Sequence, residues 1–231
     1  MGGSRYTRGL ARRITAGAII NGRLAGYGDY STPEQHLPIA SPDLPVWEMC
    51  MTMNDSWGYQ PNDTNYKTAS EIIHIFADVI GKGGNLLLDI GPRADGSIPE
   101  EQKQLLHEMG RWTNANHEAI FNTRAGMPAG HFYGPTTLSA DSLHLYLFLS
   151  GQQKGPVMIK GLKNHIVDAS ILGSGQSVEP REVSKISWSK VPGLIFLQLP
   201  DAALDPVMTV VKLTLGSPLS LYRGQGHFYE D

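Results

Sequence analysis

The feature that most restricts the fold is a change of hydrophobic period about half-way along the chain. Between residues 5 and 122, short apolar runs alternate with segments whose apolar residues recur at helical spacing. After Gly126-Met127-Pro128, the helical spacing disappears, and short apolar runs follow one another between Gly, Pro and Asp residues. The first pattern predicts a parallel β/α architecture. The second predicts an antiparallel sandwich, so we expect two domains, residues 1–125 and 126–231.

The stretch from residue 68 to residue 90 shows the alternation most clearly. Thr68 and Glu71 have the spacing of a capping box, which predicts the start of a helix. Residues 81–84 (Gly-Lys-Gly-Gly) end that helix, and residues 85–90 follow as an unalternating apolar run, typical of a strand covered on both faces. A second helix opens at Pro99. Its expected buried stripe is Leu105, Leu106, Met109 and Trp112.

Composition and charge exclude several classes of function. A net charge of −3, with 41% hydrophobic and 18% charged residues, predicts a soluble globular protein without a nucleic-acid or anionic-membrane partner. No apolar run approaches the roughly 20 residues of a membrane span, and residues 16–20 are too short for a signal peptide. Cys50 is the single cysteine and is expected to be a buried, inert thiol, so the sequence leaves the compartment undetermined.

Metal and phosphate chemistry also lack their usual patterns. No His pair has the spacing of a zinc-protease helix, and no cysteine cluster exists. Residues 81–84 are rich in glycine, but they precede a strand rather than a helix, so no helix N-terminus would face an anion. We therefore expect no metal site and no cofactor.

Three polar loops follow the apolar runs of the first half, within residues 21–36, 54–59 and 91–97. In parallel β/α folds, chemistry gathers on the loops at the carboxyl ends of the strands. The loops carry arginine, tryptophan and carboxylates. Guanidinium groups donate to sugar oxygens, an indole face packs against sugar C–H groups, and a carboxyl group can protonate a departing glycosidic oxygen. Together they indicate a sugar site.

At these residues the sequence resembles the α-L-fucosidases of glycoside hydrolase family 29. The resemblance covers residues 20–124, and residues 130–215 are less specifically similar to the C-terminal β-sandwich of that family. It implies the later part of a TIM-like catalytic barrel, that is a half-barrel, followed by an antiparallel β-sandwich. The segments that carry it are residues 47–53, 56–59, 82–88, 90–92, 95–96, 98–99 and 118–121.

The resemblance also implies site residues. In a retaining mechanism it makes Glu34 the acid/base, and it matches Arg23 and Trp57 to groups that bind the fucose. The family nucleophile is an aspartate on an upstream strand, so no residue here inherits that role. Asp55, whose loop also bears Trp57, is the first candidate for a second carboxylate. Three further candidates lie near predicted strand ends: Asp29, Asp95 and Asp89, the last of which stands where the family usually has asparagine.

These residues predict a glycoside hydrolase that releases terminal α-L-fucose from fucosylated glycans or aryl fucosides. The alternatives are a non-catalytic fucose-binding or structural remnant that lacks the nucleophile, and a fragment of a longer gene. An open half-barrel leaves strand edges and apolar side chains unpaired, so we expect a homodimer or larger homo-oligomer that completes it. In the alternative arrangement, the arginine-rich segment 5–13 covers the open edge.

Overall fold

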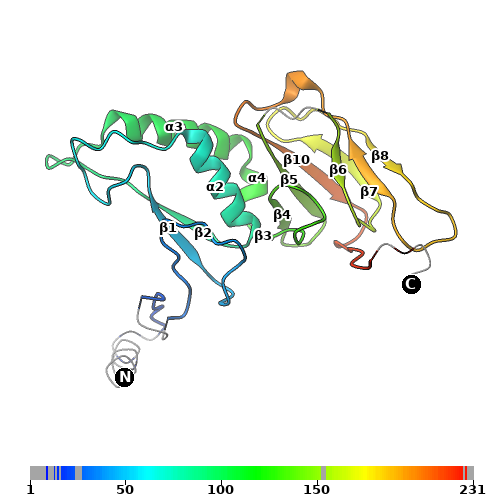
Figure 1. The fold of residues 1–231 in the computed structure, drawn as a ribbon, viewed down its shortest axis with the longest axis horizontal. Helices are drawn as coiled ribbons and strands as arrows, with labels where there is room; N and C mark the ends of the chain where they lie inside the picture. The colour runs from blue at the N-terminus through cyan, green and yellow to red at the C-terminus, as the bar shows by residue number, and fades with distance from the viewer. Residues whose placement is uncertain are drawn as a thin grey trace. The chain divides into compact units, whose positions relative to one another are not determined.

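The fold is described by a computed structural model of the chain (Figure 1). It covers residues 17–23, 28–151 and 155–225, and the single residues 9, 13, 15 and 227. Contacts divide the chain into two compact units: the first is 1–67 with 83–102, and the second is 68–82 with 103–231. The units interleave along the chain, so the boundary between residues 125 and 126 stays a prediction. Most of segment 5–13, the alternative cover for the open edge, lies outside the described residues.

The first unit contains chain segments that pair in parallel. Strand β1 (Glu48–Thr52) pairs with β2 (Asn85–Asp89), with Cys50 opposite Leu87. On the other side of β1, isolated parallel bridges join Ser31 to Trp47 and Glu34 to Cys50. The prediction of parallel strands in the first half is confirmed for these segments.

The two faces of β1 and β2 differ in burial. Met49 and Met51 of β1 are 1% exposed, whereas Cys50, on the opposite face, is half-buried. Leu87, the partner of Cys50 in the register, is 50% exposed. The apolar run alone predicted cover on both faces, which is wrong at Leu87, whereas the expected open half-barrel predicted exposed apolar side chains on this strand. An unalternating apolar run shows that both faces of a strand can be buried, but it does not show which segments of the fold cover each face.

Three helices contribute to the second unit. Helix α2 (Ala69–Gly81) starts with the predicted capping box, in which the Glu71 N–H donates to Thr68 Oγ1 and the Thr68 N–H donates to Glu71 Oε2. Helix α3 (Glu100–Ala115) begins in the first unit and continues into the second, and α4 (His117–Ile120) follows it. No helix in the described part of the chain is both long and apolar enough to cross a membrane.

All strand pairs of the second unit are antiparallel, as predicted. One sheet has the order β3-β4-β5-β10-β7, and the other has the order β6-β9-β8. A short 3-10 helix, Asp201–Ala203, precedes the last strand. The strand bounds in chain order are β3 Thr123–Ala125, β4 Thr136–Ser139, β5 His144–Ser150, β6 Val157–Ile159, β7 Ile166–Ile171, β8 Pro180–Val183, β9 Leu194–Leu197 and β10 Met208–Leu215.

Strand β5 is buried on both faces. Leu145, Leu147 and their neighbours on β10 share one core with residues of β6 and β9, so the two sheets face each other. Tyr146 and Phe148 point the other way, into a second core with residues of the helices. In that second core Trp112 is fully buried, and its indole N–H donates to the Met208 carbonyl at 2.7 Å.

The predicted stripe of α3 is only partly correct. Trp112 is fully buried, but Leu106 is 39% exposed. Helical periodicity identifies a set of residues on one side of a helix, but the width of the contact depends on what packs against it. In α3, the contact with the second core is made by Trp112 and, partly buried, Met109.

Candidate active site

The first feature of the site is the turn at Gln35, where the segment that bridges to β1 in parallel ends. The Cys50 N–H donates to the Pro33 carbonyl at 3.0 Å, and the Gln35 N–H donates to the Cys50 carbonyl at 2.8 Å. At Gln35 the main chain takes a left-handed conformation, with φ of 59°. The next hydrogen bond to β1 is made by the Gln35 side chain instead of the backbone, since the Thr52 N–H donates to Gln35 Oε1 at 3.3 Å. Glu34 therefore stands at the last ordinary strand position before the turn.

The left-handed conformation of Gln35 is held by side-chain contacts. A non-glycine residue in this region costs about 1–3 kcal/mol and persists only where the surroundings fix it. Here Gln35 Nε2 donates to Thr52 Oγ1 at 3.1 Å, and Thr52 is 1% exposed. Thr52 Oγ1 in turn donates to the Asn54 carbonyl. The turn after Glu34 is thus tied to the buried end of β1.

Glu34 forms an ion pair with Arg23. The Arg23 Nη2 atom lies 2.7 Å from Glu34 Oε2, and the two side chains are 52% and 40% exposed. The loop of Arg23 is packed closely, since a Cβ on Gly28 would lie 2.5 Å from the Gly22 Cα. The structure therefore brings together two residues that the sequence assigned to the site. Side by side, they present a carboxyl group and several N–H donors to a ligand.

A second carboxylate lies on the same face as Glu34. Glu34 and Cys50 are bridge partners and so share a face, and Asp89 lies two residues beyond Leu87, the partner of Cys50. Burial raises the pKa of the Cys50 thiol, against the opposing effect of the Arg23 charge, and the Asp89, Glu34 and Glu48 charges raise it further. Burial also raises the pKa of Asp89. Cys50 is half-buried beside these charges rather than enclosed in a core.

Asp55 and Trp57 lie on a loop of their own. Trp57 is 44% exposed, as a sugar-stacking residue needs to be. Asp55 is exposed, and its Oδ2 accepts a hydrogen bond from Asn65 Nδ2 at 2.8 Å, within the same loop. Among the residues that the structure describes, no hydrogen bond or ion pair joins Asp55 or Trp57 to Arg23 or Glu34.

The second and third loops contact each other through residues that sequence reasoning did not single out. The Arg93 guanidinium lies 5.4 Å from the centroid of the Tyr59 ring. A Cβ on Gly91 would lie 2.9 Å from the Tyr59 nitrogen, so the two loops approach as closely as glycine permits. The Gly91 N–H donates to Oε1 of the buried Gln102 at 3.0 Å. Together these contacts hold the third loop against the base of the loop that bears Trp57.

Two other predicted carboxylates, Asp95 and Asp29, accept hydrogen bonds from backbone N–H groups. Asp95 Oδ1 accepts from both the backbone N–H and the hydroxyl of Ser97, and these hydrogen bonds lower its pKa. Asp29 Oδ2 accepts from the Ile20 N–H at 2.9 Å. Within the described ranges, no group of three His, Cys, Asp or Glu side chains could hold a metal ion.

Comparisons with known proteins point to one family. The model of the α-L-fucosidase family matches residues 7–118. An α-L-fucosidase of Dictyostelium discoideum is 30% identical over 176 residues, which cover 73% of this chain and 38% of that protein. The plasma α-L-fucosidase of Homo sapiens is 31% identical over 139 residues, which cover 56% of this chain and 30% of that protein. The chain thus spans about a third of the length of these curated relatives.

The similarity in structure extends over nearly the whole chain. The α-L-fucosidase isoenzyme 1 from Paenibacillus thiaminolyticus superimposes with a TM-score of 0.80 at 28% identity, and the match covers 94% of this chain and 54% of that one. The region of shared fold therefore reaches beyond residues 7–118 into the antiparallel sheets.

Proposed function

We propose, from the premise that this chain belongs to the α-L-fucosidase family, that it acts in the release of terminal α-L-fucose from fucosylated glycans. The observation that carries the proposal is the Arg23–Glu34 pair, at 2.7 Å, in a segment that bridges in parallel to β1. The carboxyl ends of parallel strands are where β/α folds place their chemistry. In this proposal residues 1–125 form the catalytic-type half-barrel, and residues 126–231 form the sandwich.

In this proposal Glu34 is the general acid/base of a retaining mechanism. In the first step it protonates the departing glycosidic oxygen, and in the second it takes a proton from the attacking water. Arg23 stays beside Glu34 and donates N–H groups to the sugar oxygens. Trp57 packs its exposed ring against the apolar side of the fucose.

The mechanism needs a second carboxylate. Asp55 was the first candidate from the sequence, and in the structure its carboxylate serves its own loop. Asp89 has the stronger support, because it shares a face with Glu34. A retaining pair stands about 5–5.5 Å apart and an inverting pair about 6.5–9.5 Å apart, so retention of configuration in the product tests the proposed retaining mechanism.

The oligomer is part of the same proposal. Strand β2 pairs with β1 along one edge, and no strand in the described part of the chain pairs with its other edge. Leu87 on β2 is 50% exposed. We infer that a second copy pairs with this edge and covers Leu87, since open edges and exposed apolar side chains favour association. Light scattering on the purified chain is expected to give a dimer or larger species, and a stable, folded monomer would contradict this part.

The decisive experiment measures hydrolysis of two α-L-fucosides that differ only in the leaving group. Glu34→Gln is expected to lower kcat/KM, which reports the first step, by about 10²–10⁴-fold for the substrate with the poor leaving group and much less for the nitrophenyl substrate, because only the former needs proton donation in that step. Glu108→Gln, a change to an exposed carboxylate on α3, is the matched control and is expected to leave both rates unchanged. An equal loss of kcat/KM on both substrates would assign Glu34 a structural role.

The second candidate function is fucose binding without turnover. It is favoured by the placement of Asp55, the first candidate for the second carboxylate, which accepts a hydrogen bond from Asn65 within its own loop. In that case the wild-type chain binds a fucose-like iminosugar and releases no nitrophenol. Trp57→Ala weakens this binding while the melting temperature stays unchanged, which distinguishes a ligand contact from a packing role.

A further inference from the structure

A pocket of about 320 Å³ lies in the second unit, beside the start of β10. Three segments line it: the end of α3 with the residue that follows it, the end of β7 with the turn after it, and residues between 202 and 210, which lead from the 3-10 helix into β10. Its volume falls within the range of about 300–1,000 Å³ that is typical of small-molecule sites. All of its lining residues belong to the second unit, and none is part of the Arg23–Glu34 site.

The buried part of the pocket contains a hydrogen-bond acceptor that the protein leaves unpaired. Asn116, directly after α3, lines the pocket and is 4% exposed. Its Nδ2 donates to the Trp112 carbonyl at 2.9 Å, and its backbone N–H donates to the same carbonyl at 3.1 Å. Among the residues that the structure describes, no group donates a hydrogen bond to Asn116 Oδ1. Because a buried polar atom without a hydrogen bond costs free energy, this oxygen favours a ligand that donates an N–H or O–H group.

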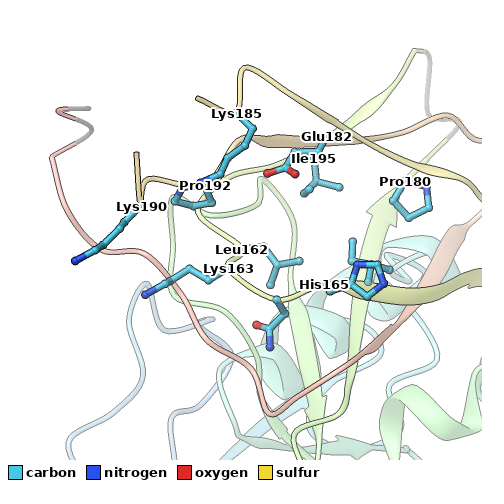
Figure 2. A pocket seen from close by; sticks show the side chains of 11 residues that line it. Leu162, Lys163, His165, Pro180, Glu182, Lys185, Lys190, Pro192 and Ile195 are labelled. Atoms are coloured by element: carbon cyan, nitrogen blue, oxygen red, sulfur yellow. The ribbon is translucent and has the colours of Figure 1, made fainter. Parts of the chain in front are cut away.

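A buried asparagine in another pocket of the same unit has both polar ends of its side chain paired. That pocket lies between the segment that leads into β7 and the loop between β8 and β9, and Asn164 is among the residues that line it (Figure 2). Asn164 Nδ2 donates to the Ser217 and Pro218 carbonyls at 2.9 and 3.0 Å. Its Oδ1 accepts from the Ser220 N–H at 2.7 Å. The unpaired Oδ1 of Asn116 therefore distinguishes the pocket beside β10 from the pocket of Figure 2.

The other buried residues of the pocket are mostly apolar. Ile171, Met208 and Val210 line it and are each 1% exposed. Alanine residues, among them Ala115 at the end of α3, complete the apolar lining with small side chains. A methyl group gains free energy when such walls bury it, whereas a polar group gains only if it finds a hydrogen-bond partner there. The ligand group that enters the pocket should therefore combine one donor with a small apolar part.

The outer part of the pocket carries an ion pair. Arg111 Nη1 lies 3.0 Å from Asp205 Oδ2, and the two side chains are 53% and 22% exposed. These are the two charged residues among those that line the pocket, so its lining has no net charge. A guanidinium group has five N–H donors, and the contact with Asp205 leaves others for the oxygens of a ligand. The pocket therefore favours a neutral ligand that is polar at its outer end.

An acetamido group on a sugar meets these requirements together. In a trans amide the N–H and the methyl group lie on the same side, and the carbonyl lies on the side of the sugar ring. The N–H and the methyl group can thus enter the pocket side by side, whereas a sugar hydroxyl brings a donor without an apolar part. We propose that this pocket binds an N-acetylated amino sugar, with the amide N–H on Asn116 Oδ1, the methyl group against Met208 and Val210, and the carbonyl and ring hydroxyls near Arg111.

The test measures binding of sugars without fucose, so it is independent of the proposed hydrolase activity. Three methyl β-D-glucopyranosides that carry an acetamido, an O-acetyl or a free hydroxyl group at carbon 2 are titrated into the whole chain, and binding is followed by chemical-shift changes. The O-acetyl compound keeps the methyl group and the carbonyl but has no N–H. Wild type is expected to bind the acetamido compound at least about tenfold more tightly than either of the others, because only this compound pairs the buried oxygen and fills the apolar part.

A variant that fills the pocket locates the binding. Ala115→Leu places a larger side chain in the lining and is expected to weaken the acetamido compound at least about tenfold. Ala140→Leu, the same change at an exposed alanine that does not line this pocket, is expected to leave the affinity unchanged. Lys163→Gln, in the pocket of Figure 2, is a second control with the same expected result. Melting temperatures are expected to stay at the wild-type value, because all three residues are exposed.

Three results would overturn the proposal: no binding of the acetamido compound, equal binding of the O-acetyl compound, or unchanged affinity in Ala115→Leu. The first of these is the result expected if a water molecule alone pairs with Asn116 Oδ1. The shifts on the wild-type chain give an answer that does not depend on any variant. The amides of residues 111–116, 171–174 and 202–210 are expected to shift with the acetamido compound, and shifts confined to residues outside these segments would assign the binding elsewhere.

Discussion

Gln35 offers a direct test of how the turn after Glu34 is stabilised. Gln35→Ala removes two hydrogen bonds to Thr52, at 3.1 and 3.3 Å, and keeps a non-glycine residue at a φ of 59°. At about 0.5–1.5 kcal/mol for each bond, the loss comes to about 1–3 kcal/mol in the free energy of unfolding. The upper half of that range is expected, because the Thr52 N–H loses its acceptor at a position that is 1% exposed.

Gln35→Gly removes the same bonds but relieves the backbone strain. A left-handed alanine costs about 1–2 kcal/mol, and the greater unfolded-state entropy of glycine returns about 0.5–1 kcal/mol of that. Gln35→Gly is therefore expected to be more stable than Gln35→Ala by about 0.5–1 kcal/mol, although it removes more of the side chain. Gln60→Ala, at an exposed position, is the control and is expected to change little.

The assay is urea unfolding, followed by tryptophan fluorescence and circular dichroism, with the midpoint and the slope compared among the four proteins. An unchanged slope shows that the extent of unfolding is the same in each variant. The argument is refuted if Gln35→Ala loses less than about 0.5 kcal/mol, since the hydrogen bonds would then contribute almost nothing. It is also refuted if Gln35→Gly is the less stable of the two variants, since the left-handed turn would then carry no strain.

Three further predictions concern charge and close packing. Burial tends to raise the pKa of Glu118, but hydrogen bonds from Lys212 and Tyr146 outweigh burial and leave the pKa lowered in the folded protein. The ionised carboxylate therefore stabilises the fold above its ordinary pKa, and this stability is lost as pH falls through the pKa of the folded state. Glu118→Gln should flatten that acid limb in melting curves recorded between about pH 2 and 7, and an unchanged limb would contradict the assignment. Burial raises the pKa of Asp89, so Asp89→Asn should raise the melting temperature at pH 7 and lose this advantage in acid. Hydrogen bonds from Ser97 lower the pKa of Asp95, so Asp95→Asn should lower the melting temperature at pH 7. Melting-temperature changes of the same sign in the two variants at pH 7 would contradict both predictions. Gly84→Ala should lower the free energy of unfolding by about 1–3 kcal/mol, because a Cβ there would lie 2.4 Å from the Trp47 ring. A Cβ at Gly110 in α3 meets nothing within 4 Å, so Gly110→Ala should raise the free energy of unfolding by up to about 1 kcal/mol. Urea midpoints measure both changes.

Local patterns predicted the parts of the fold that depend on local chemistry. The capping box of α2 was readable because its two partners, Thr68 and Glu71, are three residues apart. The parallel strands were readable from their alternation with helices. The exposure of Leu106 was not readable, because it depends on which distant segments cover that face of the helix.

The candidate site shows the same division. Arg23 and Glu34 were identified through the resemblance to fucosidases. Their ion pair could not be predicted from the sequence, because it depends on how the two loop segments fold against each other. Gln35 carried no signal in the sequence, since its conformation is fixed by Thr52, seventeen residues away along the chain. No local sequence pattern predicts a left-handed main-chain conformation at a glutamine. The pairing of Tyr59 with Arg93 likewise joins two loops that are distant in sequence.

Strand β5 has a consequence for how the second unit opens. Its odd-numbered residues Leu145, Leu147 and Leu149 belong to the core between the sheets, and its even-numbered residues Tyr146 and Phe148 belong to the core under the helices. Neither layer can detach without exposing one side of the same strand. The helices and the three-stranded sheet are therefore coupled into one cooperative unit, in which the amides of β5 exchange with solvent only when the whole unit unfolds, while the strands at the sheet edges exchange through smaller openings.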